Sequence, residues 1–425
     1  MEETPPAAGR PPRLGLVHAL VLASGFGAMA QAPLQPYLVQ RLAASAAERS
    51  SGAGAAEAAD RHHAGLQTAY SVAQLAGALA FGPLVDRRGP AAGLLVSLLG
   101  AAASWGATAA ARSVGELYLA KALLAAQQTV MCARGVVTLA TRPESRSRQL
   151  GFVGMSFGLG FALGPAVGGA LGKRRGPQFV SAAAAGLAAA SAALVAAGLV
   201  GGVGPPPAGR GGAATPAPPG LAGWLAPFRA VAKMPAIRRL LAIKLLGGVG
   251  FSLFQSSFAL VLKNVFALDP RTNGLVMSFV GLNVIVSQAG LVGWLAKTYG
   301  EAKAQRICAA GLAVTYLALA GTSTRFDAFL ALLVPLCLLG GSFGTINTAA
   351  LTKAAPADQV GVVLSLDMAL GTAVRIGSPL AAVWLLERSG SAGVFGCCAA
   401  LNAVLYGFMA VGRAGGEEEA KAKAS

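Results

Sequence analysis

The sequence is poor in charge, and above all in acids. Of 425 residues only 12% are charged, and 17 Asp and Glu stand against 34 Lys and Arg. The five cysteines fall in apolar stretches without the spacing of metal ligands, so we read them as small buried residues. No phosphate-binding loop, metal cluster or nucleophile–base pair is recognisable, so we expect no enzyme, no metal and no cofactor.

The excess of basic residues does not indicate a nucleic-acid partner. Lys and Arg occur in short segments between long apolar runs, and they do not form a basic surface that also carries aromatic residues. The mean hydropathy is +0.61 and 55% of the residues are hydrophobic. These values predict a protein whose main partner is the lipid bilayer.

Twelve apolar segments have about the 20 residues that a helix needs to cross a bilayer. They lie at about 14–40, 64–85, 90–111, 116–140, 150–172, 178–203, 240–262, 273–296, 304–322, 328–352, 362–386 and 391–412. Residues 41–63 read as a polar loop, and prolines 33 and 36 should kink the first segment. Ala28-Met29-Ala30 also resembles a signal-peptide cleavage site, but cleavage would leave an odd number of crossings.

An internal repeat relates the two halves of the chain. Gly82-x-Leu84-x-Asp86-x-x-Gly89 recurs as Gly293-x-Leu295-x-Lys297-x-x-Gly300, and Gly164-Pro165 has a counterpart in Ser378-Pro379. We therefore expect an all-α membrane protein with twelve transmembrane helices in two pseudo-symmetric six-helix bundles. The bundles are 14–203 and 237–413, joined by a cytosolic linker at 204–236, with disordered ends at 1–13 and 414–425. The distribution of Lys and Arg places both termini in the cytosol.

The turn after the second segment carries the first candidate site, formed by Gly82, Asp86, Arg87, Arg88 and Gly89. It resembles the turn that the major facilitator superfamily has between its second and third helices. The resemblance implies alternating access between two bundles. Because a helix N-terminus attracts an acid, we expect Asp86 to lie against the start of the eleventh helix and to gate the cytosolic end.

A second motif, formed by Gly160, Gly164, Pro165, Gly168 and Gly169, resembles the antiporter motif of the same superfamily. Small residues at this spacing let two helices pack backbone to backbone, so generic glycine packing is the competing interpretation.

Polar residues within the spans are the substrate and coupling candidates. A charge at a span centre costs about 2.5–3.5 kcal/mol, which makes each one a functional candidate. The ionisable group comprises Lys121, Arg134, Lys244, Asp367 and Arg375, of which Arg375 is nearest to mid-span. The neutral group comprises Gln31, Gln67, Gln74, Gln127, Gln128, Gln255, Asn283, Gln288 and Asn347. For each neutral residue, contact between helices is as good an interpretation as contact with substrate.

Several stretches also resemble the organic-cation-transporter-like branch (member 18) of solute carrier family 22. Among them are Pro36-Tyr37-Leu38, Met277-Ser278-Phe279, Lys244, and Arg375 with Pro379. The resemblance implies a proton-coupled exporter of organic cations in the plasma membrane or an endomembrane. We therefore expect antiport of organic cations and xenobiotics, and we expect a monomer. This chain departs from the pattern at two positions. Lys121 replaces the arginine that is usual at its position in the family, and Lys297 replaces aspartate in the turn of the second half.

The charge of the spans conflicts with a cationic substrate. Four bases and one acid would attract an anion, so the charge of the substrate stays open. An anion transporter is one alternative. A scaffold or sensor that no longer transports and acts through its cytosolic linker is the other.

Overall fold

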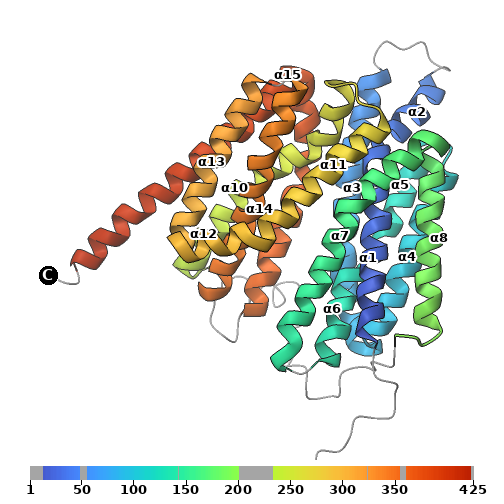
Figure 1. The fold of residues 1–425 in the computed structure, drawn as a ribbon, viewed down its shortest axis with the longest axis horizontal. Helices are drawn as coiled ribbons and strands as arrows, with labels where there is room; N and C mark the ends of the chain where they lie inside the picture. The colour runs from blue at the N-terminus through green and yellow to red at the C-terminus, as the bar shows by residue number, and fades with distance from the viewer. Residues whose placement is uncertain are drawn as a thin grey trace, which may run out of the picture. The chain divides into compact units, whose positions relative to one another are not determined.

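The computed structural model describes residues 13–47, 55–141, 143–200, 233–322, 324–354 and 360–422. In these ranges the regular structure is entirely helical (Figure 1). Nine helices of the described chain are long and apolar enough to cross a bilayer, judged by length and composition. The expectation of an all-α, multi-span membrane protein is therefore confirmed.

The chain divides into two compact units. Unit 1 comprises Met1–Ala56, Val72–Ala214 and Asp269–Gly281, and unit 2 comprises Glu57–Ser71, Thr215–Leu268 and Leu282–Ser425. Each unit therefore contains a short segment from the other half of the sequence. The linker expected at 204–236 and the N-terminal segment expected at 1–13 lie almost wholly outside the described residues.

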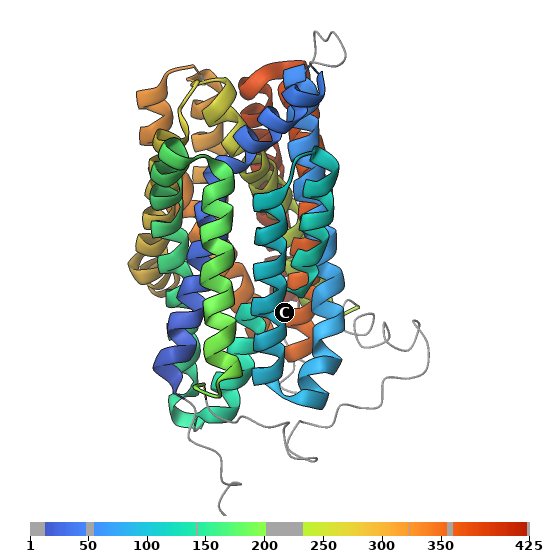
Figure 2. The ribbon, with the colours of Figure 1, turned by 90° about the vertical axis from the view of Figure 1, so that its right-hand side faces the viewer.

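Unit 1 is a bundle of long helices packed side by side. Its elements are α1 (Leu14–Gln31), η1 (Ala32–Leu34), α2 (Gln35–Ala47), most of α3 (Ala55–Arg88), α4 (Pro90–Ala110), α5 (Val114–Ala122), η2 (Leu123–Ala126), α6 (Thr129–Ala140), α7 (Pro143–Arg175), α8 (Pro177–Ala196) and the first part of α11 (Pro270–Val286). Helix α1 packs along α7 and α8, and α4 packs along α8 (Figures 1 and 2). Apolar side chains such as Leu20, Leu98 and Val136 fill the interior.

Unit 2 is built around an aromatic cluster. Its elements are residues 57–71 of α3, α10 (Pro235–Asn264), the end of α11, the π-helical turn η3 (Ser287–Leu291), α12 (Val292–Tyr299), α13 (Glu301–Gly321), α14 (Phe326–Ala354) and α15 (Val360–Ala422). Helix α10 packs against α15 and α14, and α13 packs against both as well. The core contains the rings of Phe254, Phe258, Tyr316, Phe329 and Phe395, and the centroids of its neighbouring rings lie 5.3 to 6.3 Å apart.

Glycines with positive φ mark the helix junctions that the sequence repeat pairs. Gly89 (φ 84°, ψ 160°) precedes α4, and its repeat partner Gly300 (φ 72°, ψ 160°) precedes α13. Gly176 (φ 85°) precedes α8, and Gly390 (φ 64°) interrupts α15. Because this backbone region is essentially restricted to glycine, the repeat extends from sequence to backbone geometry.

The prediction of a polar loop at residues 41–63 is wrong at both ends of that range. Helix α2 continues to Ala47, and α3 begins at Ala55. The charges of Asp60 and Arg61 suggested a loop, but both side chains have polar partners on helices of unit 2. Pairing lets charged residues lie on a packed helix.

Other boundaries differ because helices break inside the expected segments. The first segment breaks at η1, which contains Pro33, as expected. The segment expected at 116–140 breaks at Gln127 and Gln128, between η2 and α6. The last two segments form α15, which bends at Gly390 and is helical to Ala422, past the expected start of the tail.

Candidate functional site

The glycine motif of α7 packs directly on the backbone of α1. A Cβ atom at Gly160 would lie 2.5 Å from the backbone nitrogen of Phe26, and one at Gly164 would lie 2.9 Å from its carbonyl oxygen. At Gly168 a Cβ atom would overlap the carbonyl group of Ala30. Three glycines spaced four residues apart thus form one face of α7 on which only hydrogen fits.

Pro165 and Gly169 form a second face of α7, against the part of α11 that belongs to unit 1. A Cβ atom at Gly274 would overlap the Pro165 carbonyl, and one at Gly169 would lie 3.1 Å from the Gly274 Cα. The Ser278 hydroxyl accepts a 2.9 Å hydrogen bond from the backbone N–H of Ala166. This donor follows a proline that disturbs the hydrogen bonding of its own helix. The motif therefore serves two backbone-to-backbone contacts within unit 1.

The glutamines of unit 1 hydrogen-bond to neighbouring helices. Gln31 accepts a 3.0 Å hydrogen bond from Ser181 of α8. The Gln74 amide donates to the carbonyl oxygen of Gln127 (3.3 Å), and the Gln128 amide donates to the Gln74 side-chain oxygen (3.1 Å). The bond from Gln74 satisfies a backbone carbonyl where the helix breaks between η2 and α6. A role for these side chains in substrate binding stays a prediction.

The structure brings together two of the predicted ionisable residues, Lys244 of α10 and Asp367 of α15. The Lys244 ammonium lies 3.1 Å from one carboxylate oxygen of Asp367 and 3.2 Å from the other. The Thr348 hydroxyl of α14 donates to the same carboxylate at 3.3 Å. The Asp367 side chain is 8% exposed and that of Lys244 23%. This base and this acid, read separately in the sequence, therefore neutralise each other.

Two further predicted amides of unit 2, those of Gln288 and Asn347, make hydrogen bonds at α14. The Gln288 amide donates to the Gly341 carbonyl at 3.1 Å, and its oxygen accepts from the Thr345 hydroxyl at 2.9 Å. Gln288 lies in η3, and π-helical turns often occur at functional sites. Asn347 is fully buried, and its oxygen accepts from Gln305 at 3.2 Å.

Other predicted residues lie apart from these contacts. Arg375 is exposed and donates to the Thr372 hydroxyl of its own helix at 3.0 Å. Gln255 of α10 is exposed too. Gln67 contacts His63 one turn earlier in α3, at 2.8 Å.

The other bases of the spans differ from Lys244. Lys121 is half-buried and Arg134 is exposed. Across the described ranges, neither of them nor Arg375 forms an ion pair with an acid. Asn283 is half-buried and has a polar contact. The charged candidates of the spans that lack an acidic partner in the described residues are therefore all positive.

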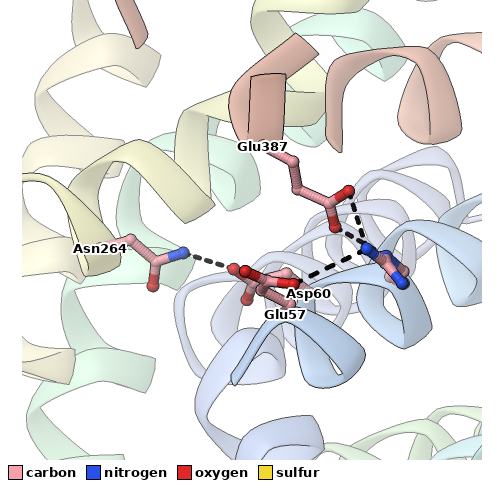
Figure 3. Close-up of polar contacts among 5 residues, drawn as sticks. Glu57, Asp60, Asn264 and Glu387 are labelled. Carbon is pink, nitrogen blue, oxygen red and sulfur yellow. Dashed lines mark hydrogen bonds and ion pairs between the residues drawn. The ribbon is translucent and has the colours of Figure 1, made fainter. Parts of the chain in front are cut away.

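The start of α3 carries a polar network that we did not predict (Figure 3). The Arg61 guanidinium holds the Glu387 carboxylate of α15 with two bonds of 2.7 and 3.1 Å, and it lies 3.7 Å from Glu57. The Asn264 amide donates to Asp60 at 2.5 Å. The hydrogen bond to Glu387 raises the pKa of Arg61 above its usual value. The acids and the base, spaced three and four residues apart ahead of an apolar run, were the signal for this helix start.

Further contacts fasten the same segment within unit 2. Lys263 of α10 pairs with Asp60 at 3.3 Å, and the Thr68 hydroxyl donates to the Ile376 carbonyl at 2.8 Å. Ala64 is buried in an apolar cluster with residues of α10 and α15. The first turns of α3 are thus part of unit 2 by charge, hydrogen bonding and packing.

Unit 1 has an ion pair beside the start of α11. The Lys173 ammonium lies 2.6 Å from the Asp269 carboxylate, which also accepts from the Thr272 N–H at 3.1 Å. The bond with Lys173 and those with Thr272 lower the pKa of Asp269 to about 2. Asp269 therefore caps α11 and stays ionised at physiological pH.

The turn predicted to gate the cytosolic end is described only in its backbone. Helix α3 ends at Arg88, whose side chain is exposed, and Gly89 begins the turn into α4. The side chains of Asp86 and Arg87, and the surroundings of Gly82, lie outside the described residues. The gating role stays a prediction. Within the described ranges, no group of three or more His, Cys, Asp or Glu could hold a metal ion.

Comparisons with known proteins identify relatives along most of the chain. A model of the Major Facilitator Superfamily matches residues 17–379. Solute carrier family 67 member A1 of Homo sapiens is 31% identical over 348 residues, which cover 78% of this chain and 79% of the relative. Solute carrier family 22 member 18 of Rattus norvegicus is 27% identical over 342 residues, covering 78% and 80%. The resemblance read from the sequence is therefore confirmed.

Solved structures share the fold at low sequence identity. The human organic anion transporter MFSD10 (TETRAN) superposes with a TM-score of 0.61 at 21% identity, covering 93% of this chain and 98% of that one. Peptide transporter POT in complex with sulfate superposes with a TM-score of 0.70 at 16% identity, covering 94% of each chain. At these identities the likeness concerns the arrangement of helices alone.

Proposed function

Since the chain belongs to the major facilitator superfamily and is a secondary transporter of small solutes, we propose that it moves small organic anions by proton-coupled alternating access. The observation that carries this proposal is Arg375. It lies about 22 Å along α15 from the start of that helix, and its side chain is exposed. An arginine facing lipid at this depth would be costly, so we assign it to a water-filled path.

Neutral polar side chains support the same path. Gln255 and Gln288 are exposed on spans of unit 2, and Thr345 is exposed beside Gln288. Such groups orient a solute by hydrogen bonds while a charge supplies the attraction. With Lys244 neutralised by Asp367, the charge left in this part of the spans is positive, which favours an anion.

Proton-coupled antiport of organic cations and xenobiotics is the second candidate, and the resemblance to the organic-cation-transporter-like branch favours it. In both cases we propose twelve transmembrane helices in two bundles and a monomer in the plasma membrane or an endomembrane. Both termini lie in the cytosol, and no nucleic acid takes part. The turn at Asp86 gates the cytosolic end. For the second candidate we propose that the α7 glycines hold the spans at the distance that antiport requires.

Flux measurements in proteoliposomes test the proposal. Benzenesulfonate and benzyltrimethylammonium are aromatic probes of similar size with a permanent charge of opposite sign. We expect benzenesulfonate to move when a pH gradient is imposed. Arg375→Ala should reduce this flux about tenfold or more, because a hydrogen bond to a charged group contributes about 1.5–3 kcal/mol. Arg134→Ala is the matched control and should reduce it less.

The outcomes separate the candidates. Flux of benzyltrimethylammonium alone would establish the cation antiporter instead. A stronger effect of Arg134→Ala would mean that Arg375 is not the binding residue. Absence of flux for a broad panel of anions and cations would leave the scaffold acting through residues 204–236.

A further inference from the structure

Basic side chains gather at one end of unit 1. Helices α4 and α7 end there, α8 begins there, and α2 lies beside them (Figures 1 and 2). Six exposed bases lie at this end: Arg41, Arg112, Lys173, Arg174, Arg175 and Arg271. Among the described residues of unit 1, the acids at the same end are Glu116 and Asp269. Six bases against two acids leave this end strongly positive.

Both of these acids already have partners. Asp269 pairs with Lys173 at 2.6 Å and accepts a hydrogen bond from the N–H of Thr272. Glu116 accepts a 2.8 Å hydrogen bond from the backbone N–H of Arg112 at the start of α5. Across the described ranges, none of the five arginines at this end forms an ion pair. Their guanidinium groups therefore keep donors available for an anion.

Three of the arginines surround Gln178, in the first turn of α8. Arg41 donates to the Gln178 side-chain oxygen at 2.6 Å. The Gln178 amide donates at 2.7 Å to the carbonyl oxygen that precedes Arg112 in the chain. The Arg175 guanidinium lies over the ring of Phe179, 5.4 Å from its centroid. We call Arg41, Arg112 and Arg175 the arginine cluster; a single glutamine joins the elements that carry them.

The repeated half of the chain shows that the fold does not require these bases. Gly176 (φ 85°) lies between α7 and α8, and Gly390 (φ 64°) lies at the matching bend of α15, 214 residues later. The same offset relates the Gly-Pro and Ser-Pro pairs of the repeat. Lys173-Arg174-Arg175 before the first glycine corresponds to Glu387-Arg388-Ser389 before the second. Since this junction also forms with one acid and one base, the three bases of unit 1 need another reason.

The arginine cluster lies where membrane helices meet lipid headgroups. Leu171 is exposed one turn before Arg175, and the Phe179 side chain that follows is 42% exposed. Leu119, two turns after Arg112, is 71% exposed. Long basic side chains at the end of a span extend towards the phosphate layer, while the apolar residues beneath them face acyl chains.

We propose that the arginine cluster binds the phosphate of an anionic phospholipid, whose acyl chains lie along the exposed apolar surface of α5 and α8. Guanidinium groups form forked, charge-assisted hydrogen bonds with phosphate oxygens. A phosphate among three guanidinium groups also relieves the repulsion between them. This inference goes beyond the proposed transport function and is independent of the solute that is moved.

The surroundings of the cluster select the kind of ligand. A zwitterionic headgroup would bring its own cation towards a positive surface, so a lipid with net negative charge fits better. A soluble phosphate would meet the same guanidinium groups but would leave the apolar residues beside them uncovered. A lipid covers both, because its phosphate and its acyl chains lie at the depths of the arginines and of the leucines.

Thermal unfolding of the purified full-length protein, freed of lipid in an uncharged detergent, tests the inference. Dioleoyl phosphatidylglycerol and dioleoyl phosphatidylcholine have the same acyl chains and differ in headgroup charge. Stabilisation by increasing lipid concentrations reports the affinity. We expect phosphatidylglycerol to stabilise the protein and phosphatidylcholine to have little effect. Glycerol 1-phosphate, which lacks acyl chains, should not stabilise the protein at the same concentrations.

Variants assign the binding to the cluster. Arg41→Gln, Arg112→Gln and Arg175→Gln should each weaken phosphatidylglycerol binding about tenfold or more, the effect of losing a hydrogen bond to a charged group. The triple variant should no longer distinguish the two lipids. Arg388→Gln is the matched control, because its guanidinium lies 5.6 Å from the ring centroid of Trp384 at the corresponding bend of unit 2. It should leave lipid binding unchanged. If the triple variant does not fold, the single variants decide.

Four results would overturn the inference. Equal stabilisation by the two lipids would mean that the bases only keep helix ends at the membrane surface. Selectivity that survives in the triple variant would place the lipid elsewhere. An effect of Arg388→Gln as large as that of Arg175→Gln would show a general effect of charge. Binding of glycerol 1-phosphate as tight as that of the lipid would assign the cluster to a soluble phosphate.

Discussion

The contact between α7 and α1 can be tested by adding a single methyl group. In Gly168→Ala the new Cβ would overlap the backbone carbonyl of Ala30, which belongs to the helix and cannot rotate away. The two helices must move apart, and overpacking of this kind costs about 1–3 kcal/mol. Gly158 lies on the same helix with nothing within 4 Å of its hypothetical Cβ. Gly158→Ala should therefore stabilise the helix by about 0.5–1 kcal/mol.

The assay is thermal unfolding of the two variants in one detergent. The expected free energies of unfolding differ by about 1–3 kcal/mol, the cost of overpacking, with Gly168→Ala the less stable. Because both variants make the same chemical change in the same helix, differences in propensity and in detergent binding cancel. If Gly168→Ala unfolds at or above the temperature of Gly158→Ala, the close approach of α7 to α1 is not what the glycine motif provides.

Three further predictions concern the helix junctions and the two charged clusters. Gly390→Ala should lower stability by about 1–3 kcal/mol, because its φ of 64° with extended ψ is nearly restricted to glycine; an unchanged unfolding temperature would contradict this. Asp269 has a depressed pKa, so its stabilising effect is complete above about pH 4 and is lost as the pH falls towards about 2. In Asp269→Asn, the loss of stability over this pH range should disappear from a plot of unfolding free energy against pH. A plot identical to that of the wild type would refute the ion pair. Arg61→Gln should loosen the start of α3 and so speed the labelling of Ala64→Cys by a maleimide. Arg325→Gln, an exposed control, should leave the labelling rate unchanged. Equal labelling rates in the two variants would show that the network does not hold the start of α3.

Much of the fold follows from local sequence because it depends on hydropathy and on glycine. Long runs with few charges predict membrane helices whatever they pack against. The repeat that contains Gly89 and Gly300 predicts matching junctions, and both glycines have a positive φ. The spacing of Gly160, Gly164 and Gly168 predicts a flat helix face, and that face meets α1.

The pairing of side chains that are distant in the sequence could not be predicted from local sequence. Lys244 and Asp367 are 123 residues apart, and nothing in the sequence around either residue indicates that the other is its partner. Arg61 and Glu387 are 326 residues apart, and the charge of the first suggested a loop where a packed helix begins. The list of four bases and one acid therefore became one neutral pair and three bases, Lys121, Arg134 and Arg375, that have no ion pair among the described residues.

The amino-acid sequence alone determined that this chain crosses a membrane many times, that its two halves repeat, and that it belongs with the major facilitator transporters. These properties depend on hydropathy and on residues close together in the chain. The tertiary structure alone decided which buried charges pair with each other and which glutamines join helices. Electrostatic and hydrogen-bonding partners are set by distances of a few ångströms in space, and only the packing of distant helices defines those distances.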